Sequence, residues 1–297
     1  MNHIALRLLL GLLFLLIAIF TNQGIAQGLK RNKLNDPFKS TQGFVGLFGG
    51  TSFSKPTMSQ MHSDFNLIDP HNNDIISDAK EYGLRVENIS SHFGISGSFS
   101  FGRNISVAIS PAYKGLTFIY QSDFEWQSDE VETNSLSIEY THLQRLHYIS
   151  IPLMLRFSPI GRKLKPYFQL GVHYDRLINA QKLVSSSGID QASGGQVSFS
   201  TDEQSNDISD LFIKSHLGLL GGLGITYNLG TILIFAESQY RYGMHNITDT
   251  KNRFSASRNL PGFGNVLDDI SIQNLELSLG IYFPLKFLTK DFSPVIL

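Results

Sequence analysis

The chain has 297 residues, a formal net charge of −1 and no cysteine. The near-neutral charge gives no reason to expect nucleic acid as a partner, and the lack of cysteine excludes disulfides, thiolate metal sites, cysteine nucleophiles and a lipid-anchored cysteine. Charged residues make up 16% of the chain, below the roughly 25% that is typical of soluble domains.

The N-terminus has the pattern of a secretory signal. Arg7 supplies a positive charge, residues 8–20 are an unbroken run of apolar residues and glycine, and small residues precede Gln27. The run is shorter than the roughly 20 residues that a membrane-spanning helix needs. The sequence therefore predicts a signal peptide over 1–26 and a periplasmic N-terminal segment over 27–42. Since no other long apolar run follows, a membrane domain in the remainder has to be a β-barrel.

From residue 43 onward, large apolar residues recur at every second position, which is the period of a β-strand. The clearest case is NLELSLGIYFPL (274–285), in which leucine, isoleucine and phenylalanine alternate with mostly polar or small residues. Eight strands are predicted, in chain order: 44–55, 89–101, 105–120, 141–158, 167–181, 213–227, 232–244 and 274–285. In the third strand the apolar residues change parity near 111–115, which predicts a β-bulge there.

The connections between these strands alternate strictly between short and long. The short ones are 102–104, 159–165 and 228–230, and the long ones are 56–88, 121–140, 182–212 and 245–270. The long ones are rich in Ser, Asn, Asp, Gln and Gly, as solvated loops are. Outer-membrane barrels have short periplasmic turns and long outer loops. We therefore expect an all-β fold, a single closed antiparallel transmembrane β-barrel of about eight strands over 43–286, followed by a C-terminal tail over 287–297.

Two features favour lipid outside and a polar interior over a lipocalin-like soluble barrel with the opposite arrangement. The polar face carries mostly Ser, Gly, Thr and Asn, which suit a tight lumen better than a water-facing exterior. Aromatic residues gather at both strand ends, as in the two interfacial girdles of membrane barrels. The predicted girdles are Phe101, Phe157, Phe168, Tyr227 and Phe283 near the short turns, and Phe118, Tyr120, Tyr174, Tyr240 and Tyr242 toward the long loops.

Charged residues inside the strands give a third indication. They are few, mixed in sign and placed on the predicted lumen face: Lys114, Arg156, Glu237, Arg241 and Glu276. On the lipid face, an Arg or Lys at mid-depth costs about 2–4 kcal/mol, whereas in the lumen these charges can pair. Arg176 falls on the apolar parity, so either it snorkels to the headgroups or a bulge resets the register.

The segments HYISIPLMLRFSP (147–159) and KPYFQLGVHYDRLINA (165–180) resemble the PorT-like family of small outer-membrane barrels. That family has an aromatic residue followed closely by Ile-Pro-Leu and a basic residue, then a Lys- or Arg-Pro-Tyr element and a glycine-rich strand. AESQYRYGMHNI (236–247), with Glu237, resembles its seventh strand. The resemblance covers about residues 43–286 and implies the outer membrane of a Gram-negative cell. The segment 182–212 and the tail depart from the shortest members.

Some PorT-like proteins serve in type IX secretion and gliding motility. The resemblance therefore implies, as partners, outer-membrane lipid, proteins of secretion or motility machinery, and the barrel assembly machinery during insertion. An eight-stranded lumen is filled by side chains, so we do not expect a porin-like open channel.

No constellation in the sequence is specific for catalysis or metal binding. His142 and His147 fall on opposite strand faces, and His173 and His216 are expected in the lumen as structural residues. Two weaker groupings are a loop set for a cation and a rim set like those of small barrels that modify lipid A or cleave polypeptides. The loop set is His62, His71, Asp64, Asp69 and Asp74, and the rim set is Ser238, His245 and Asp249. We expect no catalytic residue, no metal and no cofactor.

The sequence favours a non-catalytic interaction or assembly subunit of the outer membrane. The alternative is a surface protein that captures an external ligand through its long loops. Phe124 and Trp126, among acidic residues of the second long loop, are suggestive of this alternative. An outer-membrane enzyme acting on lipid or polypeptide is the third reading.

Overall fold

The computed structural model describes ten ranges of the chain: 42–62, 67–68, 75–76, 80–82, 88–101, 104–128, 134–161, 163–192, 195–253 and 266–285. The expected signal peptide, nearly all of the segment 27–42 and the tail 287–297 lie outside the described residues. Within the described ranges, no helix combines the length and the hydropathy needed to cross a bilayer.

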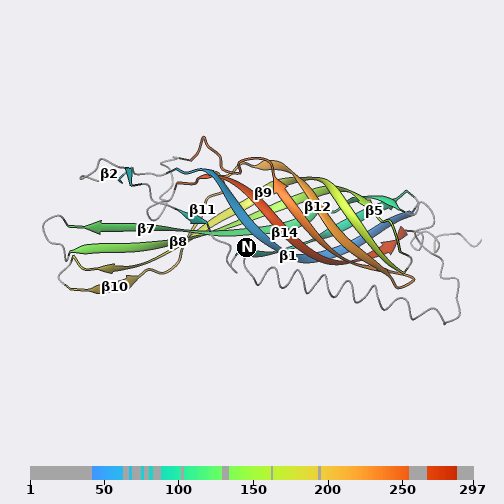
Figure 1. Cartoon of the computed structure of the whole chain (residues 1–297), viewed down its shortest axis with the longest axis horizontal. Coiled ribbons are helices and arrows are strands. Elements are labelled where there is room, and N and C mark those ends of the chain that lie inside the picture. Colours follow the sequence, from blue (N-terminus) through green and yellow to red (C-terminus); the bar gives the residue numbers. More distant parts are fainter. Residues whose placement is uncertain are drawn as a thin grey trace, which may run out of the picture. The chain divides into compact units, whose positions relative to one another are not determined.

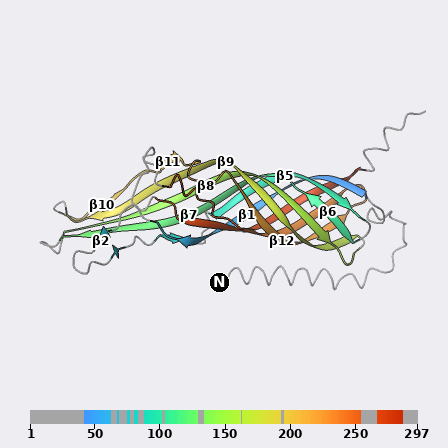
Figure 2. The same ribbon diagram turned by 90° about the horizontal axis from the view of Figure 1, so that it is seen from above.

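The described residues form an antiparallel sheet that closes into an eight-stranded ring (Figures 1 and 2). The strands of the ring are β1 (Gln42–Gln60), β5 (Ile89–Ser100), β6 (Ile105–Ile109) continued by β7 (Ala112–Gln127), β8 (Ser135–Phe157), β9 (Leu164–Asp190), β12 (Ser215–Asn228), β13 (Leu233–Gly243) and β14 (Asp269–Pro284). β1 pairs with both β14 and β5, and the β8–β9 pairing completes the ring. The predicted closed barrel is therefore confirmed.

Within the described ranges, five short strands lie outside the ring. β4 (Glu81–Tyr82) adds to β7, and both β10 (Val197–Ser200) and β11 (Gln204–Asp207) add to β9. β2 (Leu67–Ile68) and β3 (Ile75–Ile76) pair with each other. The added strands β4, β10 and β11 lie in stretches that were predicted to be solvated loops.

The two faces of the wall have the predicted orientation. On β14, Leu277, Leu279 and Phe283 are 43%, 67% and 43% exposed on the outside of the ring, whereas Glu276 and Ser278 are buried inside it. The same alternation of exposed and buried side chains holds on the other ring strands, and the exposed ones form an apolar belt around the barrel. The girdle residues predicted near the short turns are all exposed on the outer face.

The bulge predicted at 111–115 is wrong. The register against β8 is unbroken, with Ile109 opposite Leu153 and Ala112 opposite Ser150. Only the strand assignment is interrupted, at Pro111, which has no N–H to donate to the ladder. The apolar residues change parity because the lumen itself becomes apolar farther along, and Phe118 and Tyr120 therefore point inward.

This inward orientation also corrects the second aromatic girdle. Phe118 and Tyr120 are fully buried in the interior, whereas Tyr174, Tyr240 and Tyr242 are exposed on the outer face as predicted. Alternation alone cannot distinguish an apolar lumen segment from a register shift, because both put large apolar residues on the other parity.

A register shift does occur in β9. Tyr148 pairs with Leu177, whereas the preceding His147 pairs with Asn179, so Ile178 is an extra residue in β9. Arg176 precedes this bulge and is exposed on the outer face. Because the bulge comes after Arg176 in the chain, it does not turn this side chain into the lumen. The outward orientation of Arg176 agrees with snorkelling toward the headgroups.

Two of the predicted long loops are largely strand. β7 continues to Gln127, β8 starts at Ser135 and β9 continues to Asp190, so that β8 and β9 have 23 and 27 residues. Crossing a membrane takes about 9–11 residues of a tilted strand. The strands therefore run on beyond the ring as a sheet (Figure 1). We call this sheet the blade and define it as 122–127 of β7, 135–140 of β8, 186–190 of β9 and all of β10.

Candidate functional site

An ion-paired network crosses the lumen near the short turns. The Arg156 guanidinium donates to Glu237 Oε2 at 3.0 Å, to Tyr282 Oη at 2.8 Å and to Gln169 Oε1 at 2.9 Å. Tyr167 Oη donates to the same Glu237 oxygen at 2.8 Å, and the guanidinium lies 5.0 Å from the centre of the Tyr167 ring. β8, β9, β13 and β14 are thereby joined across the interior. We call this group the inner network.

A second network lies farther along the lumen, and we call it the middle network. Glu276 on β14 pairs with Lys114 on β7 at 2.7 Å and with Arg241 on β13 at 2.8 Å. Arg241 also donates to Ser150 Oγ at 2.7 Å. The five strand charges predicted to face the lumen all do so, and the structure pairs each of them. Buried charges need such partners, because an unpaired one is strongly destabilising.

His173 and His216 both enter the lumen, as predicted, and they flank Asp175. The Asp175 Oδ2 atom lies 3.2 Å from His173 Nδ1 and 3.4 Å from His216 Nε2. Asp175 was not among the predicted lumen residues, although its parity matches that of His173 two residues earlier. Within the described ranges, no three His, Cys, Asp or Glu side chains are grouped so that they could hold a metal ion.

The other candidate residues do not form the predicted sets. His142 faces inward and stacks on Tyr120 at 4.5 Å, whereas His147 stacks on the outward-facing Tyr113. These two histidines therefore lie on opposite faces, as predicted.

In the rim set, His245 Nδ1 lies 3.3 Å from the Leu217 carbonyl oxygen. Asp249 accepts from backbone and side-chain groups of its own turn, and Ser238 lies on the outer side of β13, so the rim set does not assemble. His71, Asp64, Asp69 and Asp74 lie outside the described residues.

An apolar cluster fills the lumen beyond Asp175, and we call it the outer plug. The ring contributes Leu116, Phe118, Tyr120, Leu146, Tyr148, Leu177, Ala180, Ile270 and Ile272, and the connections contribute Ile208, Leu211, Phe212, Ile247 and Leu267. At the opposite end, beside Arg156 and Lys165, a cavity of about 30 Å³ remains, room for roughly two water molecules. The networks and the plug therefore fill the lumen rather than line a channel.

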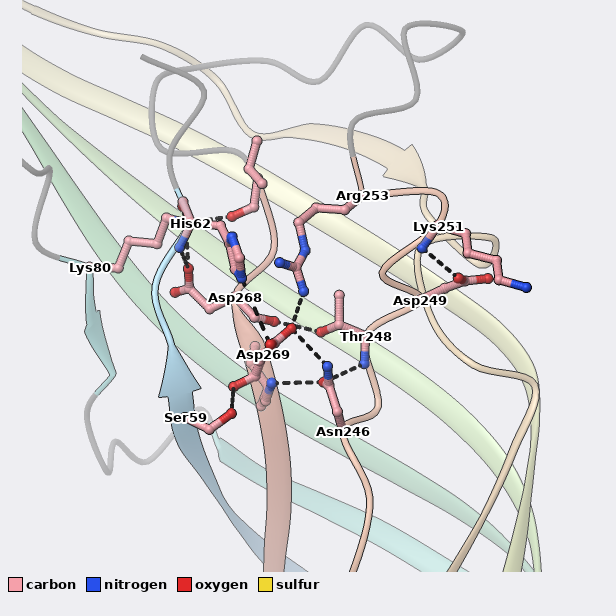
Figure 3. Close-up of polar contacts among 12 residues, drawn as sticks. Ser59, His62, Lys80, Asn246, Thr248, Asp249, Lys251, Arg253, Asp268 and Asp269 are labelled. Atoms are coloured by element: carbon pink, nitrogen blue, oxygen red, sulfur yellow. Dashed lines mark hydrogen bonds and ion pairs between the residues drawn. The ribbon is translucent and has the colours of Figure 1, made fainter. Parts of the chain in front are cut away.

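A polar cluster lies above the plug, where the first and fourth long connections meet β14 (Figure 3). Asp268 is fully buried and accepts from Lys80 Nζ at 3.0 Å, from the His62 backbone N–H at 2.7 Å and from Tyr82 Oη at 2.7 Å. Lys80 also donates to the His62 and Val266 carbonyl oxygens. Burial and the neighbouring Asp268 carboxylate raise the pKa of Tyr82 well above its usual value, so its hydroxyl remains a donor.

The adjacent Asp269 binds the fourth connection. Its carboxylate accepts from Asn246 Nδ2 at 2.8 Å, pairs with Arg253, and lies 3.8 Å from His62 Nε2 (Figure 3). Thr248 Oγ1 donates to the Asp268 carbonyl oxygen at 2.6 Å. We call the contacts of Asp268 and Asp269 the clasp. His62 is thus a structural residue of the clasp, a role that no sequence signal indicated because its partners lie some 200 positions away.

A closed antiparallel ring with an apolar belt outside and paired charges inside defines a small transmembrane β-barrel. The chain belongs to the outer membrane protein beta-barrel domain family, whose model matches residues 26–249. Its location is therefore the outer membrane, with outer-membrane lipid around it. No curated protein matches the chain.

Several solved outer-membrane proteins are similar to this chain. OprG from Pseudomonas aeruginosa is 14% identical, with 82% of this chain and 97% of that chain covered and a TM-score of 0.37. The attachment invasion locus protein Ail of Yersinia pestis is 12% identical, with 82% and 99% covered and a TM-score of 0.29. Outer membrane protein W of E. coli is 15% identical, with 81% and 97% covered and a TM-score of 0.29.

Proposed function

We propose that the protein is a non-catalytic interaction or assembly subunit of the outer membrane. The observation that carries this proposal is the contrast between a filled lumen and an extended, ordered surface beyond it. Two charge networks and the outer plug occupy the interior, which does not suit transport through the barrel. The blade instead offers several strands of protein surface outside the ring, which suits the binding of another macromolecule.

A role beside secretion or gliding machinery is the finer form of this proposal. It is supported by the resemblance to the PorT-like family, whose basic residue after Ile-Pro-Leu, Lys-Pro-Tyr tyrosine and seventh-strand glutamate correspond to Arg156, Tyr167 and Glu237. In the structure these three side chains contact one another. The motif residues thus share one physical task, the stabilisation of a closed barrel, which explains why they identify an architecture and not a reaction.

Affinity purification in mild detergent from native outer membranes, with stoichiometry by mass spectrometry, tests the proposal. A stoichiometric set of partner proteins is the expected result, and secretion or motility components among them would support the finer form. A clean monomer from the same membranes would contradict an assembly role. The proposed division of the chain is a signal peptide (1–26), an N-terminal segment (27–42), the barrel (43–286) and a tail (287–297). A mature chain that starts at Gln27 by mass in the same experiment would support the first of these boundaries.

The alternative proposal is a surface protein that captures an external ligand through its outer connections. The exposure of Trp126 at 46% on the blade favours it. Ligand binding by the purified barrel without any membrane partner would distinguish it from an assembly subunit. An enzymatic role finds less support, because the His173–Asp175–His216 group lies buried in the interior beneath the outer plug.

A further inference from the structure

The strand register of the blade sorts its side chains onto two faces. Directly opposed residues in an antiparallel sheet share a face, and one row is Trp126, Leu136, Asp190 and Val197. The next row on that face is Phe124, Ile138, Gly188 and Phe199. We call this face the inner face of the blade, because its positions have the same parity as the lumen-facing positions of β7 and β8. It carries six large apolar side chains in two adjacent rows.

The opposite face of the blade carries mostly polar and acidic side chains. Its rows are Asp123, Glu139, Ser187 and Ser200, and then Glu125, Ser137, Ile189 and Ser198. Within the described part of the blade, Ile189 is the single large apolar side chain on these two rows. The blade is therefore amphipathic, with the two-residue alternation of a sheet that has one face covered and the other in water.

The inner face continues the apolar interior of the barrel. Tyr82, Tyr120, His142 and Tyr140 form a run of ring contacts from the plug to the base of the blade, with centroids 5.2, 4.5 and 6.2 Å apart. Farther out, Gly188 leaves room for the Phe199 ring, which would collide with a Cβ atom there. At the end of the face, Trp126 and Val197 are 46% and 55% exposed. These two side chains lie at opposite edges of the outermost row, on β7 and β10, and a contiguous apolar surface of this kind marks an interaction site.

The charge of the blade and its connections restricts what can cover this face. Residues 121–140 contain six acidic residues and residues 183–212 contain five, and neither segment contains a Lys, Arg or His. Asp190 lies on the inner face itself, between Leu136 and Val197. Such a concentration of one sign attracts cationic partners and repels anionic ones. A second copy of the chain would bring the same negative charge, and anionic lipid headgroups would be repelled as well.

We propose that the inner face of the blade docks a basic polypeptide segment in which apolar side chains alternate with Lys or Arg. The apolar side chains would cover the two apolar rows. One cation would meet Asp190, and the acidic residues elsewhere on the blade and its connections would attract the others at longer range. The inference rests on the proposed function, for which it names the surface and the chemistry of the partner.

The single tryptophan of the chain makes this testable, because Trp126 lies on the inner face and its fluorescence reports on this face alone. The mature protein in zwitterionic nanodiscs would be titrated with a synthetic peptide of alternating Lys and Leu. Matched peptides would carry Glu in place of Lys, or Ser in place of Leu. The Lys–Leu peptide should shift the emission to shorter wavelength in a saturable way, and raising the salt concentration should weaken its binding. Equal shifts with the Glu–Leu or Lys–Ser peptide would overturn the proposal.

Variants test whether the face is correctly assigned. Val197→Ser, at an exposed position, should weaken Lys–Leu peptide binding roughly tenfold, and Phe199→Ser should do the same or more. Ile189→Ser, on the opposite face of the neighbouring strand β9, is the matched control and should bind like the wild type. Equal losses for Ile189→Ser and Val197→Ser would contradict the assignment. Heat-modifiable migration in gels would verify that each variant is folded.

Purification from native membranes separates this inference from the proposed function. If Val197→Ser and Phe199→Ser retain the full partner set of the wild type, the inner face is not the docking surface, although the assembly role stands. If the wild type has no stoichiometric partner, the assembly role fails whatever the peptide result. The same Trp126 fluorescence assay can be run at increasing protein concentration or with added anionic vesicles. An emission shift in either case would contradict a basic polypeptide as the partner of this face.

Discussion

Lys114 and Glu276, from strands β7 and β14, form an ion pair in the lumen with 2.7 Å between Nζ and Oε1. The Nε atom of Arg241 lies 2.8 Å from the other carboxylate oxygen of Glu276. One buried carboxylate thus compensates two cations that belong to different walls of the ring. The arrangement joins β7 to β13 and β14 across the interior of the ring.

Glu276→Gln should therefore destabilise the barrel by about 3–5 kcal/mol, because it leaves Lys114 and Arg241 buried without their carboxylate. Urea unfolding from lipid vesicles measures the change. Glu125→Gln, on the blade, is the control and should leave the free energy of unfolding within about 0.5 kcal/mol of the wild type. A Glu276→Gln barrel as stable as the wild type would show that the pair is dispensable.

The closed ring should resist denaturation by detergent at room temperature. We expect the unboiled protein to migrate in gels at an apparent mass different from that of the boiled protein, because the β8–β9 pairing completes the ladder and leaves no open edge in the membrane. The membrane fraction before and after boiling gives the measurement. One mobility under both conditions, together with protein in the soluble fraction, would refute a membrane barrel.

The inward orientation of Phe118 predicts a large effect of its truncation. Phe118→Ala should cost about 3–5 kcal/mol, as expected for a phenylalanine removed from a packed interior, because the side chain is fully buried in the outer plug. Phe168→Ala, on the outer face near the short turns, serves as the comparison and should cost less. A larger loss of stability for Phe168→Ala than for Phe118→Ala would contradict the inward packing of Phe118.

The filled lumen predicts an electrical property as well. Planar-bilayer recordings of the wild-type protein should show no stable, large conductance, since side chains of the two networks and the plug occupy the interior. Steady conductance steps of porin size would contradict a filled lumen and would indicate an open channel.

The clasp should be sensitive to alkaline pH through Tyr82. The pKa of Tyr82 is raised in the folded protein by burial and by Asp268, so ionisation is opposed in the folded state but not in the unfolded state. The stabilisation by the neutral hydroxyl is fully present below about pH 10 and is lost as the pH rises above it. Hydrogen exchange of the His62 amide, which donates to Asp268, measures opening of the clasp. Its rate should rise more steeply above pH 10 in the wild type than in Tyr82→Phe, beyond the ordinary base catalysis seen in both. Identical pH profiles would contradict the role of Tyr82.

Local alternation in the sequence was enough to predict the fold class, the orientation of the two faces and the lumen side of five strand charges. This works because a strand places successive side chains on opposite faces, and because Lys114, Arg156, Glu237, Arg241 and Glu276 tolerate the lumen and not the lipid. The same reasoning failed at Phe118 and Tyr120. The change of parity was recognised but was attributed to a bulge. In the structure these rings face an apolar part of the lumen, which residues distant in sequence such as Ile208 and Phe212 complete.

The tertiary structure supplied everything that depends on which strands and connections meet. Local polarity suggested solvated loops at 121–140 and 182–212, whereas the pairing of β7, β8, β9 and β10 satisfies their backbone groups and builds the blade. The clasp of Asp268 and Asp269 likewise joins residues from both ends of the chain. Ring closure and packing determine which strands pair, and therefore which distant residues share a face. The alternation within a single strand carries no information about these partners.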